Sequence, residues 1–166
     1  ACSSPHLIVW LGERIELAKE RFWSAIYSTV SEKYNLVEVN VVDKYTLLCK
    51  NAIEFNSISS FSNHSNFIYR IGMNELPDNT DELRGKCGYF YEYDASDISN
   101  VAHIINPKYQ TLTYFGVARS SLLDFVVKNR LPGIDRIVPV GRSLDIEVIW
   151  DGIDIVKRLS RIIDVK

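Results

Sequence analysis

Hydrophobic positions along the chain alternate between short continuous runs and longer stretches with helical spacing. Residues 6–11 form a short, nearly all-apolar run of the kind buried in a covered sheet, and Gly12 ends it. Over residues 13–34 the apolar residues recur at helical spacing, and charged residues occupy intervening positions. The pattern therefore predicts a buried strand over residues 6–11 and an amphipathic helix over residues 13–34.

The same reasoning predicts the remaining elements. A second helix is expected over residues 43–55, and the Ser- and Asn-rich stretch 56–66 is predicted to be a loop. A helix over residues 96–105 would be capped by Ser96 or Asp97. The other predicted elements are strands over 67–71, 89–93, 111–117 and 136–140, a helix over 120–129, an extended segment over 145–150, and a last helix from Asp151 to about residue 163.

This order of elements predicts the fold class. Strands separated by helices of about ten residues or more need crossover connections, which make neighbouring strands parallel. Helices formed by such crossovers cover the two faces of the sheet. We therefore expect one three-layer α/β/α domain with a mostly parallel sheet, spanning residues 1–166.

Composition narrows the classes of function. A formal net charge of −2 gives no basic footprint for nucleic acid. No apolar stretch reaches the roughly 18 residues that would indicate a membrane span, and the first residues do not resemble a signal peptide. The three cysteines form no C-x-x-C pair, which favours reduced thiols in a cytoplasmic setting. The three histidines are scattered, so no metal site is expected.

The first candidate for chemistry is Cys2, which lies directly before the predicted strand 6–11. A thiol on the turn leading into a buried strand suits a nucleophile, because the strand fixes the backbone and small neighbours leave room for a carbonyl. His6 is four residues away and is a candidate to polarise the thiol, although a packed or surface histidine is the alternative. A nucleophile so close to the first residue leads us to expect that the domain is part of a longer protein.

The second candidate stretch is Asp81-Glu82-Leu83-Arg84-Gly85. Two adjacent carboxylates before a glycine-containing turn could place one acid in a cleft, and the alternative is a solvated loop. Cys87, beside the start of a predicted strand, is interpreted as a buried structural thiol. The aromatic side chains of the strand over 89–93 are expected to pack in the core rather than to form a binding platform.

The third stretch runs over residues 133–152, where glycines and Pro139 imply specified backbone geometry. Arg136 and Arg142 in this stretch could bind an anion, and surface ion pairs are the alternative. The chain contains no G-x-G-x-x-G, G-x-x-x-x-G-K-[ST] or G-x-S-x-G motif. A phosphate-cradling loop of these common types and a hydrolase nucleophile elbow are therefore not expected.

Taken together, these stretches resemble the C-terminal part of the LuxC-type long-chain acyl-CoA reductases, a family of the aldehyde dehydrogenase superfamily. Ala1-Cys2-Ser3-Ser4-Pro5 resembles the segment that carries the acyl-accepting cysteine, and Asp81-Glu82-Leu83-Arg84-Gly85 resembles the Glu-x-Phe-Gly turn of the superfamily. Residues 108–116 and 133–152 resemble family-specific stretches. Arg84 departs from the pattern, because it stands where phenylalanine is usual.

The resemblance implies an aldehyde-dehydrogenase-like catalytic domain whose N-terminal cofactor-binding domain is absent. Cys2 would accept the acyl group of a long-chain acyl-CoA or acyl-protein, its backbone N–H would contribute to an oxyanion hole, and NADPH would reduce the acyl-cysteine to the aldehyde. Glu82 would bind the hydroxyls of the nicotinamide ribose. The resemblance also implies a homo-oligomer, and acyl-protein synthetase and acyl-transferase subunits as partners.

Two alternatives stay open from the sequence. The chain could belong to a different enzyme of the same superfamily, either a CoA-acylating or an oxidising aldehyde dehydrogenase. It could also be a non-catalytic interaction domain that keeps the fold and assembles subunits. Covalent labelling of Cys2 by acyl-CoA separates the enzyme from the assembly domain.

Overall fold

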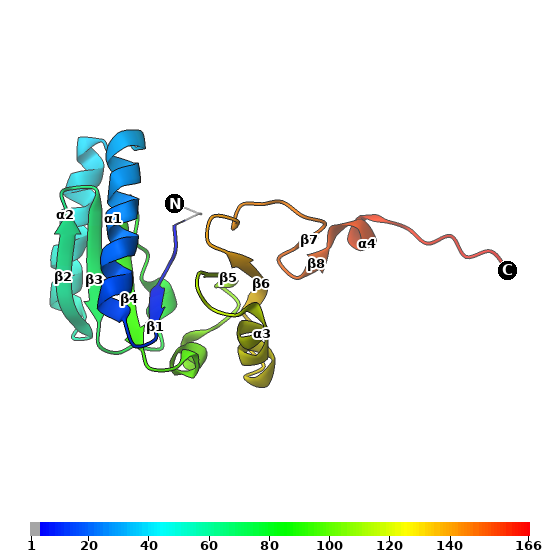
Figure 1. The fold of residues 1–166 in the computed structure, drawn as a ribbon. Helices are drawn as coiled ribbons and strands as arrows, with labels where there is room; N and C mark the ends of the chain where they lie inside the picture. The colour runs from blue at the N-terminus through cyan, green and yellow to red at the C-terminus, as the bar shows by residue number, and fades with distance from the viewer. Residues whose placement is uncertain (1–3) are drawn as a thin grey trace. The chain divides into compact units, whose positions relative to one another are not determined.

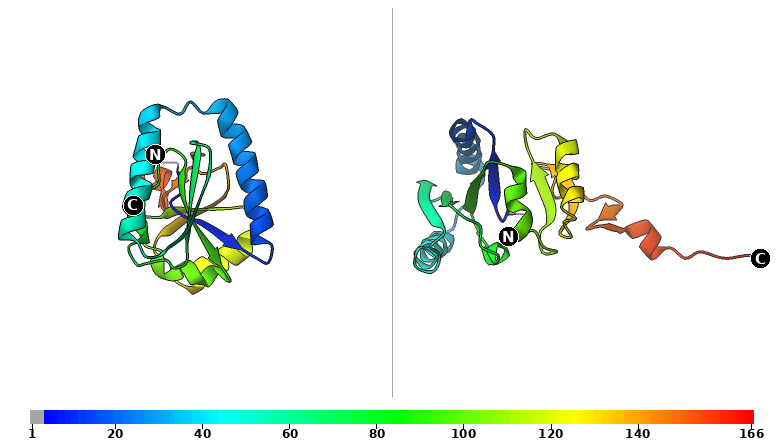
Figure 2. Two further views of the ribbon diagram at one scale, coloured as in Figure 1. Left: turned by 90° about the vertical axis from the view of Figure 1, so that its left-hand side faces the viewer. Right: turned by 90° about the horizontal axis from the view of Figure 1, so that it is seen from below.

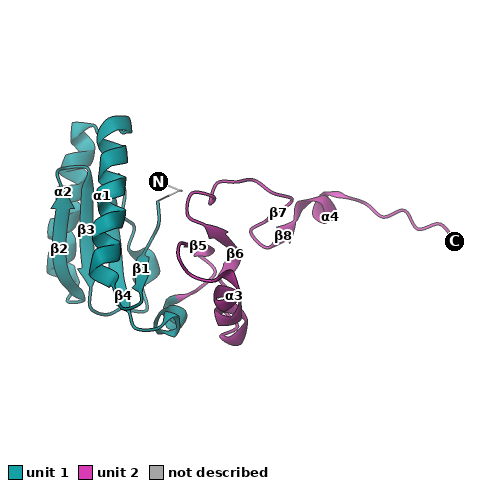
Figure 3. Cartoon of the chain, in the orientation of Figure 1, with its two compact units in different colours: residues 1–104 teal, residues 105–166 magenta. Residues whose placement is uncertain are grey.

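A computed structural model describes residues 4–166, and the chain divides into two compact units, residues 1–104 and residues 105–166 (Figure 3). Each unit has its own sheet, and the two are described separately below. The prediction that residues 1–166 form one catalytic domain of a longer enzyme stays a prediction.

Unit 1 is built on a four-stranded mixed sheet in the order β1-β4-β3-β2 (Figure 1). β1 pairs with β4 and β4 pairs with β3 in parallel, whereas β2 runs antiparallel to β3 at the edge. The predicted α/β class with a mostly parallel sheet is therefore confirmed. The elements of unit 1 are β1 (Ile8–Leu11), α1 (Ile15–Lys33), α2 (Glu38–Glu54), β2 (Ile58–His64), β3 (Ile68–Met73), the 3-10 helix η1 (Thr80–Glu82), β4 (Tyr89–Ala95) and the 3-10 helix η2 (Ile98–Ile104).

Helices α1 and α2 pack on opposite faces of this sheet, as Figure 2 shows. Successive side chains of a strand point to opposite faces, so β4 presents Phe90 to one helix and Tyr89 to the other. On the α1 face, the rings of Trp23 and Phe90 lie 5.1 Å apart. On the α2 face, Asn51 donates a hydrogen bond to the Tyr89 hydroxyl at 2.9 Å. Each face is thus closed by one helix.

The α1 face has an aromatic core centred on Trp23, which is 1% exposed. Its ring meets Phe22 edge-on at 5.0 Å, and Phe22 in turn meets Trp10 of β1 at 5.5 Å. The guanidinium of Arg70 stacks on Trp23 at 5.1 Å. Edge-to-face aromatic pairs and a cation over an indole each add stabilisation beyond the area that they bury.

The α2 face is unusual because its two most buried helix residues are polar. Lys44 and Asn51 are each 2% exposed. The Lys44 ammonium donates hydrogen bonds to the backbone carbonyls of Asn66 and Phe67. Its Nζ also lies over the Tyr69 ring, 5.0 Å from the ring centroid. Burial lowers the pKa of Lys44, and the neighbouring thiol of Cys87 opposes that shift. Buried polar groups of this kind are tolerated because they are hydrogen-bonded.

Two predictions about unit 1 are corrected by the structure. Residues 56–66 are not a loop, because Ile58–His64 form β2 and pair with β3 along its length. The strand lies at the sheet edge and most of its side chains are exposed, so polar residues there bury little polar surface. The second helix begins at Glu38 rather than at residue 43, despite the β-branched residues in its first turns.

Unit 2 is smaller. β5 (Gln110–Tyr114) and β6 (Ile134–Pro139) pair in parallel, and α3 (Arg119–Lys128) connects them as the predicted crossover helix. A short hairpin follows, formed by β7 (Ile149–Trp150) and β8 (Ile153–Asp154). The predicted helix from Asp151 to about residue 163 is wrong in extent, since α4 covers only Ile155–Leu159. The segment after α4 is exposed, so no packing supports a longer helix.

The predicted helix over residues 96–105 is present as η2, a 3-10 helix over Ile98–Ile104. Its start is fixed by polar side chains as predicted. The Asp97 carboxylate accepts a hydrogen bond from the Ser99 N–H at 2.8 Å, and the Asn100 side chain accepts one from the Asp97 N–H at 3.1 Å. The hydrogen bonds that Asp97 receives from Ser99 lower its pKa.

The buried amide of Asn51 provides a first test of the α2 face. Its Nδ2 also donates to the Tyr91 hydroxyl at 2.5 Å, so Asn51→Ala would remove the partner of two buried phenols. Leaving buried polar groups unpaired costs about 1–3 kcal/mol, and we expect a loss of about 2–3 kcal/mol in the free energy of unfolding. Urea denaturation measures it, and Asn35→Ala at an exposed position is the control. A loss no larger than that of the control would contradict this role.

Candidate functional site

The predicted nucleophile Cys2 lies outside the described residues, so the structure begins on this side of the site at Ser4. The first informative side chain is His6, which is half-buried just before β1. Burial lowers the pKa of His6, the positive charge of Arg84 lowers it further, and the negative charge of Asp81 opposes the shift. The segment that follows Cys2 is therefore electrostatically coupled to the segment 81–84, the second candidate stretch of the sequence.

The structure separates the two adjacent carboxylates of that stretch. Asp81, in η1, is 6% exposed, whereas Glu82 at the end of η1 is exposed to solvent. Burial therefore distinguishes the two acids, because Asp81 is withdrawn from solvent and Glu82 is not. Within residues 4–166, no hydrogen bond or ion pair engages the Glu82 carboxylate.

The path of the chain after η1 depends on Gly85. A Cβ on this residue would lie 2.0 Å from the backbone oxygen of Tyr89, so only glycine fits this close approach. Leu83 is buried on the way to Gly85, while Arg84 between them is exposed. The turn thus holds Arg84 and Glu82 at the surface, with Leu83 and Asp81 anchored inward.

Cys87 differs from its predicted role. It is half-buried rather than buried, and its φ of 52° lies in the left-handed region. Its thiol is near two other titratable groups, Tyr34 and Lys44. Burial, followed by a hydrogen bond to Cys87, raises the pKa of Tyr34. The interpretation of Cys87 as a fully buried structural thiol is therefore wrong.

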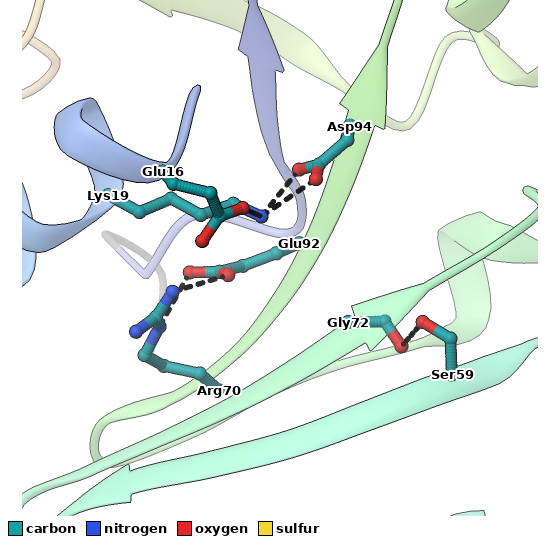
Figure 4. A network of polar contacts seen from close by, with 7 residues as sticks. All are labelled: Glu16, Lys19, Ser59, Arg70, Gly72, Glu92 and Asp94. Carbon is teal, nitrogen blue, oxygen red and sulfur yellow. Dashed lines mark hydrogen bonds and ion pairs between the residues drawn. The ribbon is translucent and has the colours of Figure 1, made fainter. Parts of the chain in front are cut away.

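A polar pocket that the sequence reasoning missed lies on the α1 face of unit 1, with a volume of about 450 Å³. Figure 4 shows its charged side chains. Arg70 of β3 forms a bidentate pair with Glu92 of β4, with Nε–Oε1 and Nη2–Oε2 both at 3.0 Å. Lys19 of α1 pairs with Asp94 at 2.7 Å and Glu16 at 3.3 Å. Glu92 is 4% exposed, so its pair with Arg70 is shielded from water.

The floor and far wall of this pocket come from two neighbouring strands. Gly72 of β3 leaves the floor open, because a Cβ there would lie 2.2 Å from the Ser60 Oγ. Ser59, Ser60 and Ser62 of β2 line the wall. The available signal in the sequence was the alternation of Glu92 and Asp94 with tyrosines along one strand, which places both carboxylates on the same face.

Two basic and three acidic side chains line the pocket, so its formal charge is one negative unit. Although burial disfavours its charge, the hydrogen bond and charge of Asp94, with the charge of Glu16, raise the pKa of Lys19. Arg70 is likewise neutralised by Glu92, which leaves hydroxyls and partly exposed carboxylates facing the opening. Such a surface suits a small polar molecule and does not suit a fatty acyl chain, which needs an apolar lining.

The arginines of the third candidate stretch do not form an anion site. Arg136 is 8% exposed, stacks on Trp150 at 4.3 Å, and donates to the carbonyls of Ser143 and Asp145, each at 3.0 Å. Arg142 forms an ion pair with Asp145 three residues on, at the surface. Both guanidiniums therefore hold the local fold of unit 2. The tyrosines of β4 pack in the core as expected, with Tyr89 and Tyr91 at most 2% exposed.

The described residues contain neither a cluster of metal ligands nor a helix that could span a membrane. Between residues 4 and 166, no three His, Cys, Asp or Glu side chains gather where they could hold a metal ion. No helix in that same part of the chain is both long and apolar enough to cross a bilayer. Comparison of the chain with protein-family models, with curated proteins and with solved structures found no match.

The coupling of His6 to its neighbours predicts a pH dependence of stability. The folded-state pKa of His6 is lowered from 6.5, so the unfolded chain binds more protons near that pH. The contribution of His6 to stability is therefore present above about pH 6.5 and lost as the pH falls. The free energy of unfolding of the wild type should fall between about pH 7.5 and pH 5, and we expect it to fall less in His6→Gln.

Denaturant unfolding at a series of pH values measures this decrease. The control is the matched substitution His64→Gln on strand β2, which should retain the decrease in unfolding free energy that is due to His6. Identical pH profiles for the wild-type chain and His6→Gln would contradict the coupling.

Proposed function

We propose that the chain is the thiol-bearing catalytic domain of an NADPH-dependent long-chain acyl-CoA reductase, which forms fatty aldehyde through an acyl-cysteine at Cys2. The observation that supports this proposal is the coupling of His6 to Asp81 and Arg84. Only three residues separate Cys2 from His6, and Glu82 lies between Asp81 and Arg84. This coupling supports a site to which the stretch before His6 and the stretch 81–85 both contribute. The finer fold proposal, a three-layer aldehyde-dehydrogenase-like catalytic domain, agrees with helices on both faces of a mostly parallel sheet.

In this proposal the chemistry at the thiol is acyl transfer. The Cys2 thiolate attacks the thioester carbonyl, a carbon–sulfur bond forms to Cys2, and the bond to the CoA sulfur breaks. NADPH, when bound, supplies the hydride that reduces the acyl group to the oxidation level of an aldehyde. The Cys2 backbone N–H stabilises the oxyanion, and release of the aldehyde returns the free thiol. The lowered pKa of His6 favours its neutral form, and in this proposal His6 accepts the proton of the thiol.

Glu82 has the properties that the ribose end of the cofactor requires. A ribose-binding carboxylate has to be accessible and able to accept hydrogen bonds from hydroxyls, and the exposed Glu82 satisfies this requirement. Arg84 beside it stands where the family has phenylalanine, and no contact with the cofactor is assigned to it.

Covalent labelling tests the nucleophile. Incubation of the full-length protein with radiolabelled long-chain acyl-CoA, without NADPH, is expected to give a hydroxylamine-sensitive adduct that maps to Cys2. Cys2→Ala should abolish the adduct. Cys49→Ala is the matched control, because Cys49 is an exposed thiol on α2 that is outside the proposed site. Equal labelling of Cys2→Ala and wild type would contradict the proposal and favour the non-catalytic assembly domain.

Kinetics of Glu82→Gln test the cofactor contact. Loss of a charge-assisted hydrogen bond is worth about 1.4 kcal/mol or more, so we expect kcat/KM for NADPH to fall about tenfold. Labelling of Cys2 by acyl-CoA should be unchanged, since it precedes reduction. Glu75→Gln, another exposed carboxylate between β3 and β4, is the control and should retain wild-type kinetics. Loss of labelling together with loss of reduction would show that Glu82 is structural.

A steady-state comparison separates the related enzymes. The full-length protein is expected to reduce acyl-CoA faster than it oxidises aldehyde to free acid. The reverse order would assign the chain to an oxidising aldehyde dehydrogenase, and efficient aldehyde oxidation to acyl-CoA would assign it to a CoA-acylating one.

A further inference from the structure

Helix α2 presents an apolar surface on the side turned away from the sheet. At 100° per residue, Lys44 and Asn51 lie on one side of the helix, and both are buried against the sheet. The opposite side carries Val39, Val42 and Ile53, which are 62%, 62% and 84% exposed. We call this surface the outer face of α2, and it consists of Val39, Val42, Thr46, Cys49 and Ile53.

The spacing of the outer face is that of a helix–helix seam. Its five residues follow one another at intervals of three, four, three and four, which is the alternation of the a and d positions of a heptad. Four of the five side chains are apolar or weakly polar, and Thr46 at the centre donates its hydroxyl hydrogen bond to the Val42 carbonyl at 2.9 Å. A solvent-facing helix surface normally carries charged and polar residues, so apolar side chains at this spacing favour a partner. A second helix with the same spacing is the partner that fits such a stripe.

We propose that the outer face of α2 pairs in antiparallel orientation with the same face of a second copy of this chain. The charges beside the stripe support this choice. Asp43 and Lys50 occupy the same flank, at the e positions of successive heptads. In an antiparallel pair the e positions face each other, so Asp43 of each copy lies opposite Lys50 of the other.

A parallel pair is disfavoured by the same charges. There the g positions face the e positions of the other helix, which brings Glu38 against Asp43 twice in the dimer. The antiparallel pair instead brings g against g, which sets the large Tyr45 beside the small Ala52 on the remaining flank. Charge and size therefore both favour the antiparallel arrangement with two-fold symmetry.

The length of the seam sets the expected affinity of the dimer. The helix has 17 residues and is about 25 Å long, and its apolar contacts number only a few layers. A seam of this size is at the low end of specific interfaces, so we expect a dimer that dissociates on dilution in the micromolar range. The outer face of α2 contains none of the residues of the proposed function, and the proposal does not depend on that function.

Sedimentation equilibrium of the 166-residue chain over a range of concentrations tests the charge pattern. Asp43→Lys and Lys50→Asp should each weaken the dimer about tenfold or more, because each places like charges together, and the double variant should restore it. Both positions are exposed, so the fold is expected to remain, and far-UV circular dichroism checks it. Single variants that dimerise like the wild type, or a double variant weaker than either, would overturn the proposal.

An apolar substitution gives an independent measurement. Val42→Lys should convert the protein to a monomer at concentrations where the wild type is dimeric. Leu123→Lys is the matched control, since Leu123 is 54% exposed on α3 and should leave the dimer unchanged. A wild-type chain that is monomeric throughout, or a Val42→Lys variant that stays dimeric, would show that something other than a second copy covers this face.

Crosslinking determines the orientation. The antiparallel register places Thr46 of each copy opposite Cys49 of the other, so Thr46→Cys should form a disulfide-linked dimer under mild oxidation. The background carries Cys2→Ala and Cys87→Ala, and the control adds Cys49→Ala, which should abolish the crosslink. Without Thr46→Cys, a parallel pair would crosslink through Cys49 alone. That result, or no crosslink with Thr46→Cys, would overturn the antiparallel assignment.

Discussion

The fold of unit 1 depends on the hydrogen bonds that two buried polar side chains of α2 make to the sheet. Lys44 and Asn51 are both almost fully withdrawn from water, where an unpaired ammonium or amide would cost more than the helix gains by packing. Both find hydrogen-bond partners. Asn51 donates to the phenols of Tyr89 and Tyr91 on β4, and Lys44 donates to the carbonyls of Asn66 and Phe67 in the turn before β3. Because these partners belong to β4 and to the turn that leads into β3, they specify where α2 sits on the sheet.

This arrangement gives α2 two contrasting sides. Its sheet-facing side combines the hydrogen-bonded Lys44 and Asn51 with the half-buried Val41, Leu47 and Leu48, and its outer face carries the exposed Val39, Val42 and Ile53. The first side fixes the helix on its own sheet, and the second is the surface that we propose for association. The α1 side shows the more usual solution, in which Trp23 anchors an aromatic cluster and the polar groups lie at its margin.

The two candidate regions of unit 1 offer different chemistry. Around His6, Asp81 and Arg84, buried and exposed charges of both signs act on a histidine close in sequence to a thiol, which suits proton transfer and acyl chemistry. In the pocket beneath α1, Arg70 pairs with Glu92 and Lys19 pairs with both Asp94 and Glu16, and the other polar groups of its lining are serine hydroxyls. These ion pairs hold a sheet and a helix together and engage both cations of the pocket.

The sequence by itself determined the succession of strands and helices in much of unit 1, the mostly parallel character of its sheet and the packing of the β4 tyrosines, and it singled out the stretches around Cys2 and Glu82 as candidates. These follow from local periodicity and from the connections that crossovers require. Only the tertiary structure decided that residues 58–64 form an edge strand, that Asp81 rather than Glu82 is buried, and that Arg70 meets Glu92. Each of these depends on pairing between segments distant in sequence, and hydrophobic spacing along one segment carries no information about its partner.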